Sequence, residues 1–384
     1  MLHWRHHAAG LLKAQGKGLI AEAVGGRVAP SGYPDPREPL ALVAHGFMGD
    51  GRNWTYPAQE LSRRLQQQQG ESGGSIVAVD MRNHGLSPHY PSHRTIDEAD
   101  DLFRMIEERS SAGGGQEDGN RSDRRPTAPP GDAVLMGHSM GGAAVMTALL
   151  ADALFEADPA AFPRTLRVDS DNDQRHRRAR RRRLRAAVIV DSSPVSKRPP
   201  TFEGLGQYLH AMMALTPEAN ATVTDADRAL KRSIIDPAMR NFLLLNFVPE
   251  RDRVRVKLET TKFASADAAA IPPHEVSAYA AHPHYGMWRC NLPVLHHALL
   301  RDDILVPEDL IAACRLRGVK VGIPVLFVYG ALSPYNSAAG KASIPELFSD
   351  ATIIDVPDAG HVVHADQREL FCDVVAPFLS RHFH

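Results

Sequence analysis

The stretch "VLMGHSMGGAAVM" (134–146) constrains this chain more than any other part of it. An apolar run leads into Gly137-His138-Ser139-Met140-Gly141, and an apolar helical pattern follows directly. A G-x-S-x-G turn between a strand and a helix exposes its serine at the apex, because the glycines tolerate the tight turn. The alternative is a glycine-rich turn with a structural serine, which requires no such flanking elements. We therefore predict that Ser139 is a nucleophile.

Short apolar runs that alternate with helical patterns predict the fold class. The runs read as strands at 40–45, 75–80, 133–138, 186–191, 324–330 and 351–357. Their near-continuous hydrophobicity is typical of parallel strands that are buried on both faces. The pattern predicts an α/β fold of the α/β-hydrolase type, with a mostly parallel central sheet flanked by helices.

Changes in composition divide the chain into four parts. Residues 1–39 form an N-terminal segment, either a targeting segment or an edge strand, and 40–198 form the first part of the core. Residues 199–318 are helix-rich and interrupt the strand series, which predicts an inserted helical lid, and 319–384 complete the core. Within the first part, 110–131 and 164–185 lack periodicity and are rich in charged or small residues, so we expect surface insertions there.

Overall composition bears on compartment and partners. A formal net charge of -1 gives no general bias towards nucleic acid or anionic membranes. Three separated cysteines match no disulfide framework or zinc site and suit a reducing compartment. No apolar run approaches the roughly 20 residues of a membrane span. The basic N-terminus, without an acid before Glu22, resembles a transit peptide, so the expected location is mitochondrial or cytoplasmic; an ordinary terminus is the alternative.

The candidate base lies after the last predicted strand. In "ATIIDVPDAGHVVHADQREL" a turn at Gly360 precedes His361, and a helix pattern begins near Ala365. A loop after this strand lies at the carboxyl edge of the sheet, where open α/β sheets place their sites. We predict His361 as the base and keep His364 as the second choice, with a packing role favoured for it.

Two backbone N–H groups are predicted to bind the oxyanion that forms on the substrate. Met140 begins the helix after Ser139, so its N–H points at the site. The loop "VAHGFMGDGRNW" follows an earlier strand and supplies the second donor, for which we favour Phe47 over Met48. His45 is expected to brace this loop.

The turn in "FVYGALSPYNS" (327–337) lacks the acid that many serine hydrolases carry after this strand. No carboxylate occurs between Ala331 and Asn336. Asp191 ends the neighbouring strand, next to that of the nucleophile, and we predict that it orients the imidazole. Asp80, beside its expected partner Arg82, and Asp358, close to His361, are the weaker alternatives.

Seven motifs together resemble one branch of a known family. They are "HGFMGDGRNW", "VDMRNHGLSPH", "GHSMGG", "VDSSPV", "NFLLLNF", "MWRCNL" and "DAGHVVHAD". The chain from about Leu40 onward resembles the α/β-hydrolase branch of the mitochondrial abhydrolase domain-containing protein 11 and related bacterial short-chain acyl esterases. The resemblance implies a Ser139–His361–Asp191 triad, because in that branch the acid follows the strand after the nucleophile.

The leading hypothesis is a serine hydrolase that cleaves carboxylic esters or thioesters of small acyl substrates through an acyl-enzyme, without metal or other cofactor. Met48, Phe242 and Trp288 are the predicted substrate contacts. An alcohol O-acyltransferase with the same triad is the alternative. Binding of nucleic acid or an acidic partner through "RHRRARRRRLR" (175–185) is a third hypothesis, weakened because the run has no aromatic residue to stack on bases. The sequence does not determine the oligomeric state.

Overall fold

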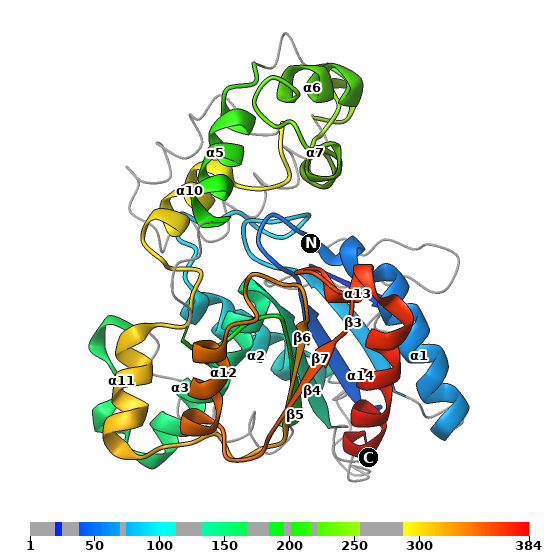
Figure 1. Ribbon diagram of the computed structural model, residues 1–384. Coiled ribbons are helices and arrows are strands. Elements are labelled where there is room, and N and C mark those ends of the chain that lie inside the picture. The colour runs from blue at the N-terminus through cyan, green and yellow to red at the C-terminus, as the bar shows by residue number, and fades with distance from the viewer. Residues whose placement is uncertain are drawn as a thin grey trace, which may run out of the picture.

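A twisted central sheet organises the chain (Figure 1). The computed structural model describes residues 20–24, 38–69, 74–112, 132–166, 184–195, 201–216, 221–253 and 287–383. Within them, a seven-stranded sheet has the order β1-β3-β2-β4-β5-β6-β7, and β1 alone is antiparallel to its neighbour. The strands are β1 Ile20–Val24, β2 Leu40–Ala44, β3 Ser75–Asp80, β4 Ala133–His138, β5 Leu184–Val190, β6 Val325–Gly330 and β7 Ala351–Val356. The predicted α/β fold and its six parallel strands are confirmed.

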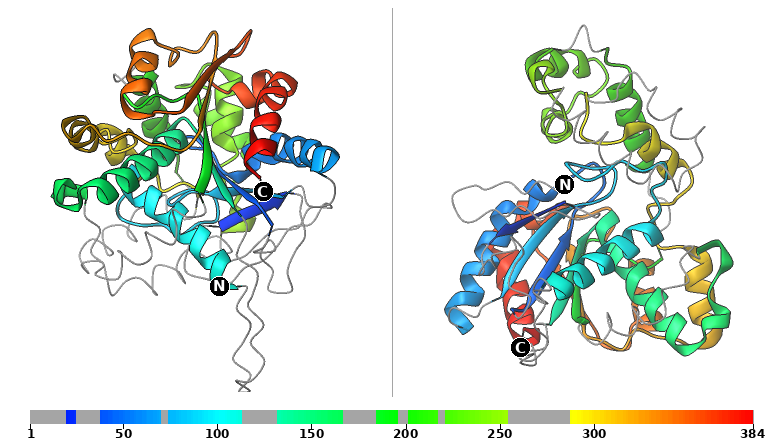
Figure 2. Two further views of the ribbon diagram at one scale, coloured as in Figure 1. Left: turned by 90° about the horizontal axis from the view of Figure 1, so that it is seen from below. Right: turned by 180° about the vertical axis from the view of Figure 1, so that it is seen from behind.

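Helices cover both faces of this sheet (Figures 1 and 2). One face carries α1 (Thr55–Gln69) and α14 (Arg368–His382), and the other carries α2 (Thr95–Ala112), α3 (Met140–Ala157) and α12 (Ala338–Leu347). Alternate strand residues enter two separate cores: Leu42 packs on one side of β2 and Val43 on the other. This double burial explains why the strands read as continuous apolar runs.

Helix α3 follows Ser139 and is apolar on all sides. It is the one described helix long and apolar enough to cross a membrane, but 72% of it is buried within the protein. It packs between the sheet and α2, with α11 (Glu308–Arg317) beside it. An all-round apolar surface is what a helix enclosed by protein requires.

A helical segment rises above the carboxyl edge of the sheet (Figure 1). It contains α5 (Thr201–Met213), α6 (Val223–Leu230), α7 (Pro237–Leu244) and α10 (Leu292–Leu300). All of these fall within the predicted range 199–318, but α11 of the same range packs against α3 on the flank of the sheet. The helices above the sheet therefore end before α11.

Helices and a strand extend into both ranges that the sequence assigns to insertions, 110–131 and 164–185. Helix α2 continues to Ala112, a short 3₁₀ helix occupies Arg164–Leu166, and β5 begins at Leu184. Leu184 is buried and pairs with Ala133, so it belongs to the sheet although a run of arginines precedes it. Residues 113–131 and 167–183, with most of the arginine run, lie outside the described residues, as does most of the predicted N-terminal segment.

Candidate functional site

Ser139 stands at the turn between β4 and α3, where the backbone is strained. Its φ is +53°, a left-handed value that non-glycine residues seldom adopt. Helix and strand cross so closely here that a Cβ on Gly141 would meet the carbonyl oxygen of Ala44, and one on Gly137 would meet Gly141. The two glycines of the motif therefore allow the close packing, and the strained turn presents the serine.

Three side chains that the sequence predicts form one chain of hydrogen bonds. His361, in the loop after β7, lies with Nε2 3.0 Å from Ser139 Oγ. Its Nδ1 is 2.6 Å from Asp191 Oδ2, and since a carboxylate only accepts, Nδ1–H donates. Nε2 is then free to take a proton from the serine hydroxyl. This is the arrangement of a nucleophile, a base and a group that fixes the tautomer of the base.

Asp191 is held by the turn that lacks an acid of its own. It follows β5 with φ +50° and is 1% exposed. The Gly330 N–H donates to its Oδ1 at 3.1 Å, and the Ser333 hydroxyl donates to its Oδ2. The predicted acid thus follows β5, and the turn after β6 supplies two hydrogen-bond donors to its carboxylate.

The alternative acids have structural roles. Asp80 accepts from the backbone of Gly51 at 2.8 Å and of Leu86 at 2.7 Å. The expected pairing of Asp80 with Arg82 is wrong, because Arg82 turns away and pairs with Asp101 at 2.6 Å. Asp358, with φ +54°, forms part of the turn before His361.

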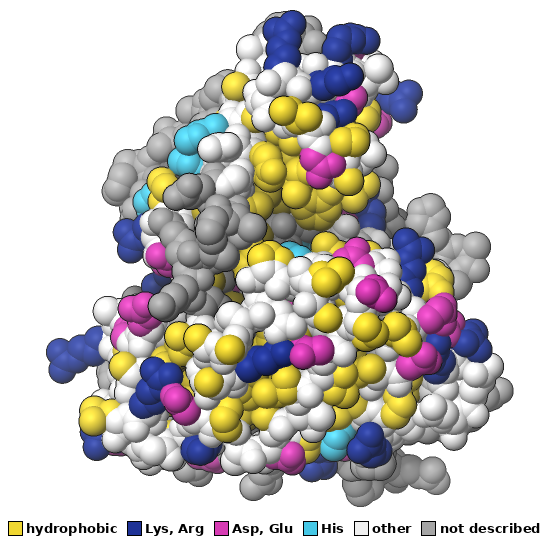
Figure 3. Space-filling view, in the orientation of Figure 1, with side chains coloured by type: hydrophobic (Ala, Val, Ile, Leu, Met, Phe, Trp, Pro, Cys, Tyr) yellow, Lys and Arg dark blue, Asp and Glu magenta, His cyan; other side chains and the backbone are white. Residues whose placement is uncertain are grey.

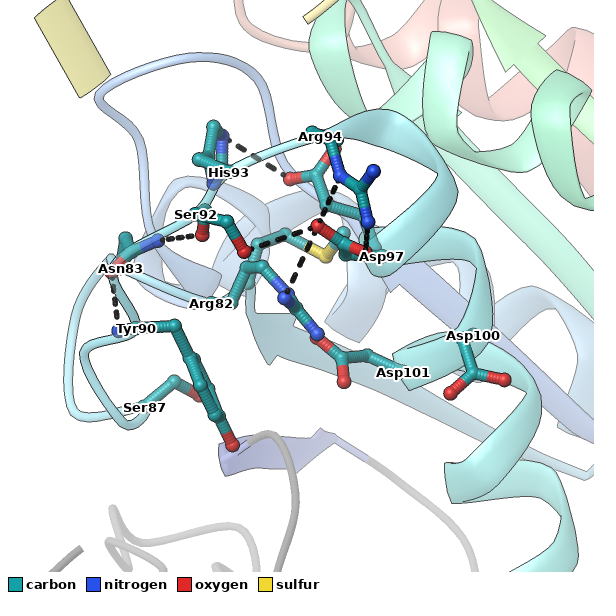
Figure 4. A network of polar contacts seen from close by, with 12 residues as sticks. Arg82, Asn83, Ser87, Tyr90, Ser92, His93, Arg94, Asp97, Asp100 and Asp101 are labelled. Atoms are coloured by element: carbon teal, nitrogen blue, oxygen red, sulfur yellow. Dashed lines mark hydrogen bonds and ion pairs between the residues drawn. The ribbon is translucent and has the colours of Figure 1, made fainter. Parts of the chain in front are cut away.

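Arg82 belongs to a polar network that fixes the loop between β3 and α2 (Figure 4). Its guanidinium lies between Asp97 and Asp101 of α2 and 4.7 Å from the centre of the Tyr90 ring. At one end of the loop, Asn83 accepts two hydrogen bonds of 2.9 Å from Asn291, one from its side-chain amide and one from its backbone N–H. Two of the sequence motifs, "VDMRNHGLSPH" and "MWRCNL", therefore pack on each other.

Hydrogen bonding separates the two candidates for the second oxyanion donor. The Met48 N–H donates to His84 Nε2 at 3.2 Å and is thus occupied. This favours Phe47, whose loop lies next to the serine: a Cβ on Gly46 would be 3.3 Å from Ser139 Cβ. His45 accepts from the Met81 N–H at 3.0 Å and is fully buried, which matches its expected bracing role.

Two further histidines support the loop of His361. His138 Nε2 donates to the carbonyl oxygen of His361 at 2.9 Å. Burial, with His361 and His364 nearby, lowers the pKa of His138 well below its ordinary value, so it stays neutral. His364 stacks on Trp54 with ring centres 4.0 Å apart, and burial lowers its pKa to about 3. The packing role favoured for His364 agrees with this geometry.

A cavity of about 440 Å³ opens beside Ser139 and His361. The helical segment contributes apolar side chains to its wall, and Figure 3 shows hydrophobic side chains gathered where that segment faces the core. Of the predicted substrate contacts, Phe242 lines the cavity. Met48 and Trp288 do not; both are fully buried, and Trp288 packs edge-on against Phe247.

A model of the alpha/beta hydrolase family matches residues 41–374. The chain belongs to this family. It is 26% identical over 352 residues to the mouse protein named "sn-1-specific diacylglycerol lipase ABHD11", covering 90% of this chain and 82% of that one. It is 24% identical over 344 residues to the Escherichia coli "Esterase YbfF", covering 89% and 93%. These similarities place the chain in the branch that the sequence motifs indicate.

A solved structure named "Marine microorganism esterase" superposes with a TM-score of 0.60 at 21% identity, covering 94% of this chain and all of that one. At this identity the similarity concerns the fold alone.

Sequence reasoning missed the residues that hold the site. Gly330 and Ser333 belong to the turn after β6, which has no carboxylate of its own. Only the folded structure shows that both residues donate hydrogen bonds to Asp191. His138 was passed over as the variable residue of the G-x-S-x-G motif, although its position beside the nucleophile was a usable signal.

Proposed function

We propose that the chain is a serine hydrolase that cleaves carboxylic esters or thioesters of small acyl substrates through a Ser139–His361–Asp191 triad. The observation that carries the proposal is the hydrogen-bond chain from Ser139 Oγ through His361 to Asp191 at the wall of an apolar cavity. Family membership and relatives named as a lipase and an esterase support the same class of reaction.

In this proposal each group has one task. Ser139 Oγ attacks the acyl carbon while His361 Nε2 takes its proton, and Asp191 stabilises the imidazolium that forms. The N–H groups of Phe47 and Met140 bind the negative charge on the acyl oxygen. His361 then gives its proton to the leaving alcohol or thiol. Water, activated by the same imidazole, releases the acid from Ser139.

The side chains that line the cavity are suited to an apolar acyl group. Leu205, Met239 and Phe242 of the helical segment line the cavity, where they would contact the chain of the acyl group and exclude water. We propose the segment as a lid for this reason, with Phe242 as a substrate contact. Asp236 also lines the cavity and disfavours substrates with an acidic tail.

Transfer of the acyl group to an alcohol is the second candidate. A yeast relative, 23% identical over 352 residues and covering 90% of this chain, is named "Probable alcohol acetyltransferase". The triad and the acyl-enzyme would be the same, and an alcohol would replace water in the second step. Product ester formed in the presence of ethanol distinguishes this activity from hydrolysis.

The test combines labelling with turnover. We expect a fluorophosphonate to label Ser139, identified by peptide mass spectrometry, and the protein to hydrolyse p-nitrophenyl esters in a chain-length series run beside acyl-CoA substrates. Ser139→Ala should abolish both signals. Ser192→Ala is the matched control, since Ser192 lines the same cavity whereas the His361 ring bonds to Ser139 and Asp191. Active protein that is labelled elsewhere would refute the assignment.

A further inference from the structure

The end of helix α7 contacts the loop that carries the predicted oxyanion donor Phe47. Asn246 lies two residues beyond α7 and is 1% exposed, and its Nδ2 donates to the carbonyl oxygen of Met48 at 2.6 Å. The two residues are 198 positions apart in the chain. A residue of the helical segment therefore bonds directly to the loop 46–49, which we call the oxyanion loop.

The bond to Met48 is the one hydrogen bond of the Asn246 side chain within the described residues. Its Oδ1 has no hydrogen-bond partner there, although it is buried. The amide must face the Met48 carbonyl with its nitrogen, because two oxygens would repel each other. Burial of a half-paired amide is unfavourable, so the bond to Met48 is what this side chain contributes beyond packing.

The oxyanion loop is strained at the residue that Asn246 holds. The Gly49 N–H donates to the carbonyl oxygen of Gly46 at 3.0 Å and closes a four-residue turn, in which Met48 has φ +58°. A positive φ at this third position usually requires glycine or asparagine, and another residue keeps it only when its surroundings hold it. Met48 is held on both sides: its N–H donates to His84 Nε2, and its carbonyl oxygen accepts from Asn246.

We infer that Asn246 is a positioning residue for the oxyanion loop, and that it acts on the Phe47 N–H through the carbonyl group of Met48. Phe47 and Met48 are the two central residues of one turn, so a change in the Met48 backbone moves the N–H of Phe47. The inference rests on the proposed function for its kinetic consequences, whereas the contacts themselves are independent of that function.

Helix α7 thus reaches the candidate site at two points. Phe242 lines the cavity, and Asn246 follows it by four residues, about one helical turn. A second bond joins the same parts of the protein, because Arg52 Nη2 donates to the carbonyl oxygen of Leu245 at 2.7 Å. Since the Arg52 bond remains when Asn246 is replaced, loss of the amide should release Met48 without releasing α7.

Asn246→Leu tests the positioning role, because leucine is similar in size and has no donor. Loss of one oxyanion donor lowers kcat by on the order of 10²- to 10³-fold, and a displaced donor has a smaller effect. We therefore expect kcat to fall about 10- to 100-fold with KM within about threefold.

Asn291→Leu is the matched control. Asn291 is also a buried amide, 3% exposed, but it donates to Asn83 and Tyr90. Its replacement should leave kcat within about threefold of the parent. A raised KM with unchanged kcat in Asn246→Leu, or equal losses of kcat in the two variants, overturns the inference. If Asn246→Leu does not fold, Asn246→Ala is compared with Asn291→Ala under the same expectations.

Inhibitors distinguish a displaced oxyanion donor from general damage to the cavity. Ser139 Oγ adds to the carbonyl carbon of an alkyl trifluoromethyl ketone, the carbonyl electron pair moves to oxygen, and His361 takes the serine proton. The oxyanion of this adduct resembles that of the transition state, whereas the alcohol with the same chain forms none. Asn246→Leu should weaken inhibition by the ketone about 10- to 100-fold and by the alcohol at most about threefold. Equal weakening of both inhibitors overturns the inference.

Hydrogen exchange separates the inference from the proposed function. Asn246→Leu should speed amide exchange in peptides that cover 46–49 by at least about tenfold, and Asn291→Leu should not. Parent protein that neither hydrolyses esters nor labels at Ser139, but shows this exchange pattern, contradicts the proposed function and supports the positioning role. Active parent protein whose Asn246→Leu variant exchanges and turns over like the parent overturns the inference and leaves the proposed function standing.

Discussion

Replacing His364 with phenylalanine should make the protein less sensitive to acid. The His364 imidazole is 2% exposed, and burial lowers its pKa to about 3. In the unfolded chain a histidine titrates near 6.5, so between these values the unfolded state binds the proton and the folded state does not. The contribution of His364 to the free energy of unfolding is therefore fully present above about pH 6.5. It is lost progressively as the pH falls from about 6.5 towards 3.

The size of the effect follows from that interval. Stability changes by about 1.4 kcal/mol per pH unit for one such group, which sums to about 2 kcal/mol between pH 7.5 and pH 5. His89 and His93, with pKa values lowered by burial to about 4 and about 3, remain in the variant and keep part of the pH dependence. We expect the variant to lose about 2 kcal/mol less than the parent over this interval.

Urea unfolding at the two pH values measures the difference. Phenylalanine can keep the stack on Trp54, and any packing cost of the change cancels because it is the same at both pH values. His297→Phe, at an exposed position, is the control and should leave the pH dependence unchanged. Equal losses in parent and His364→Phe would refute the burial argument. Loss of esterase activity in the folded variant would instead indicate that the base is misassigned.

Three further changes have clear expected outcomes. Asp191→Asn should lower kcat by about 10⁴-fold, because Asn does not enforce the required tautomer of His361. Asp358→Asn should lower kcat only by about a few-fold. Steady-state kinetics that rank the two variants in the opposite order would contradict the acid assignment. Asp236→Asn keeps the N-cap of α7 but removes a negative charge from the cavity wall. The kcat/KM for a p-nitrophenyl ester with a terminal carboxylate should therefore rise about three- to tenfold, whereas the kcat/KM for a neutral ester should not rise. Gly141→Ala should destabilise the fold by about 2 kcal/mol or more in urea unfolding, because the new methyl group meets the Ala44 carbonyl oxygen; unchanged stability would show that the strand and helix can separate there.

The inner strands of the sheet were predictable from sequence because they are buried on both faces. Burial of residues such as Leu42 and Val43 on opposite sides of β2 leaves no position for a polar residue, so this strand reads as an uninterrupted apolar run. The start of β5 was less predictable. Leu184 follows several arginines, and its place in the sheet depends on pairing with Ala133, a contact between distant segments.

Residues named from local motifs lie together in the structure, whereas only Phe242 of the three predicted substrate contacts lines the cavity. Ser139 and His361 sit in sequence contexts that define a turn and a strand end, so their positions followed from topology. Met48 lies in the predicted oxyanion loop and Trp288 in the predicted lid, but large apolar side chains also fill the core, and both do so here. The donors from the turn after β6 were beyond prediction because a serine hydroxyl can bond to many partners, and only the packing of β5 beside β6 selects Asp191.

The wide spacing of the candidate site along the chain has a consequence for the protein's synthesis. Ser139 and His361 are 222 residues apart, and Asp191 and His361 are 170 apart. Under the proposed function, a growing chain that already contains Ser139 and Asp191 still lacks its base, because β7 and the loop of His361 come last among the strands in chain order. We expect such a chain to be inert towards acyl compounds throughout most of its translation. Activity towards acyl compounds would then appear late and abruptly during synthesis. The time of its appearance would report when the last strand has joined the sheet.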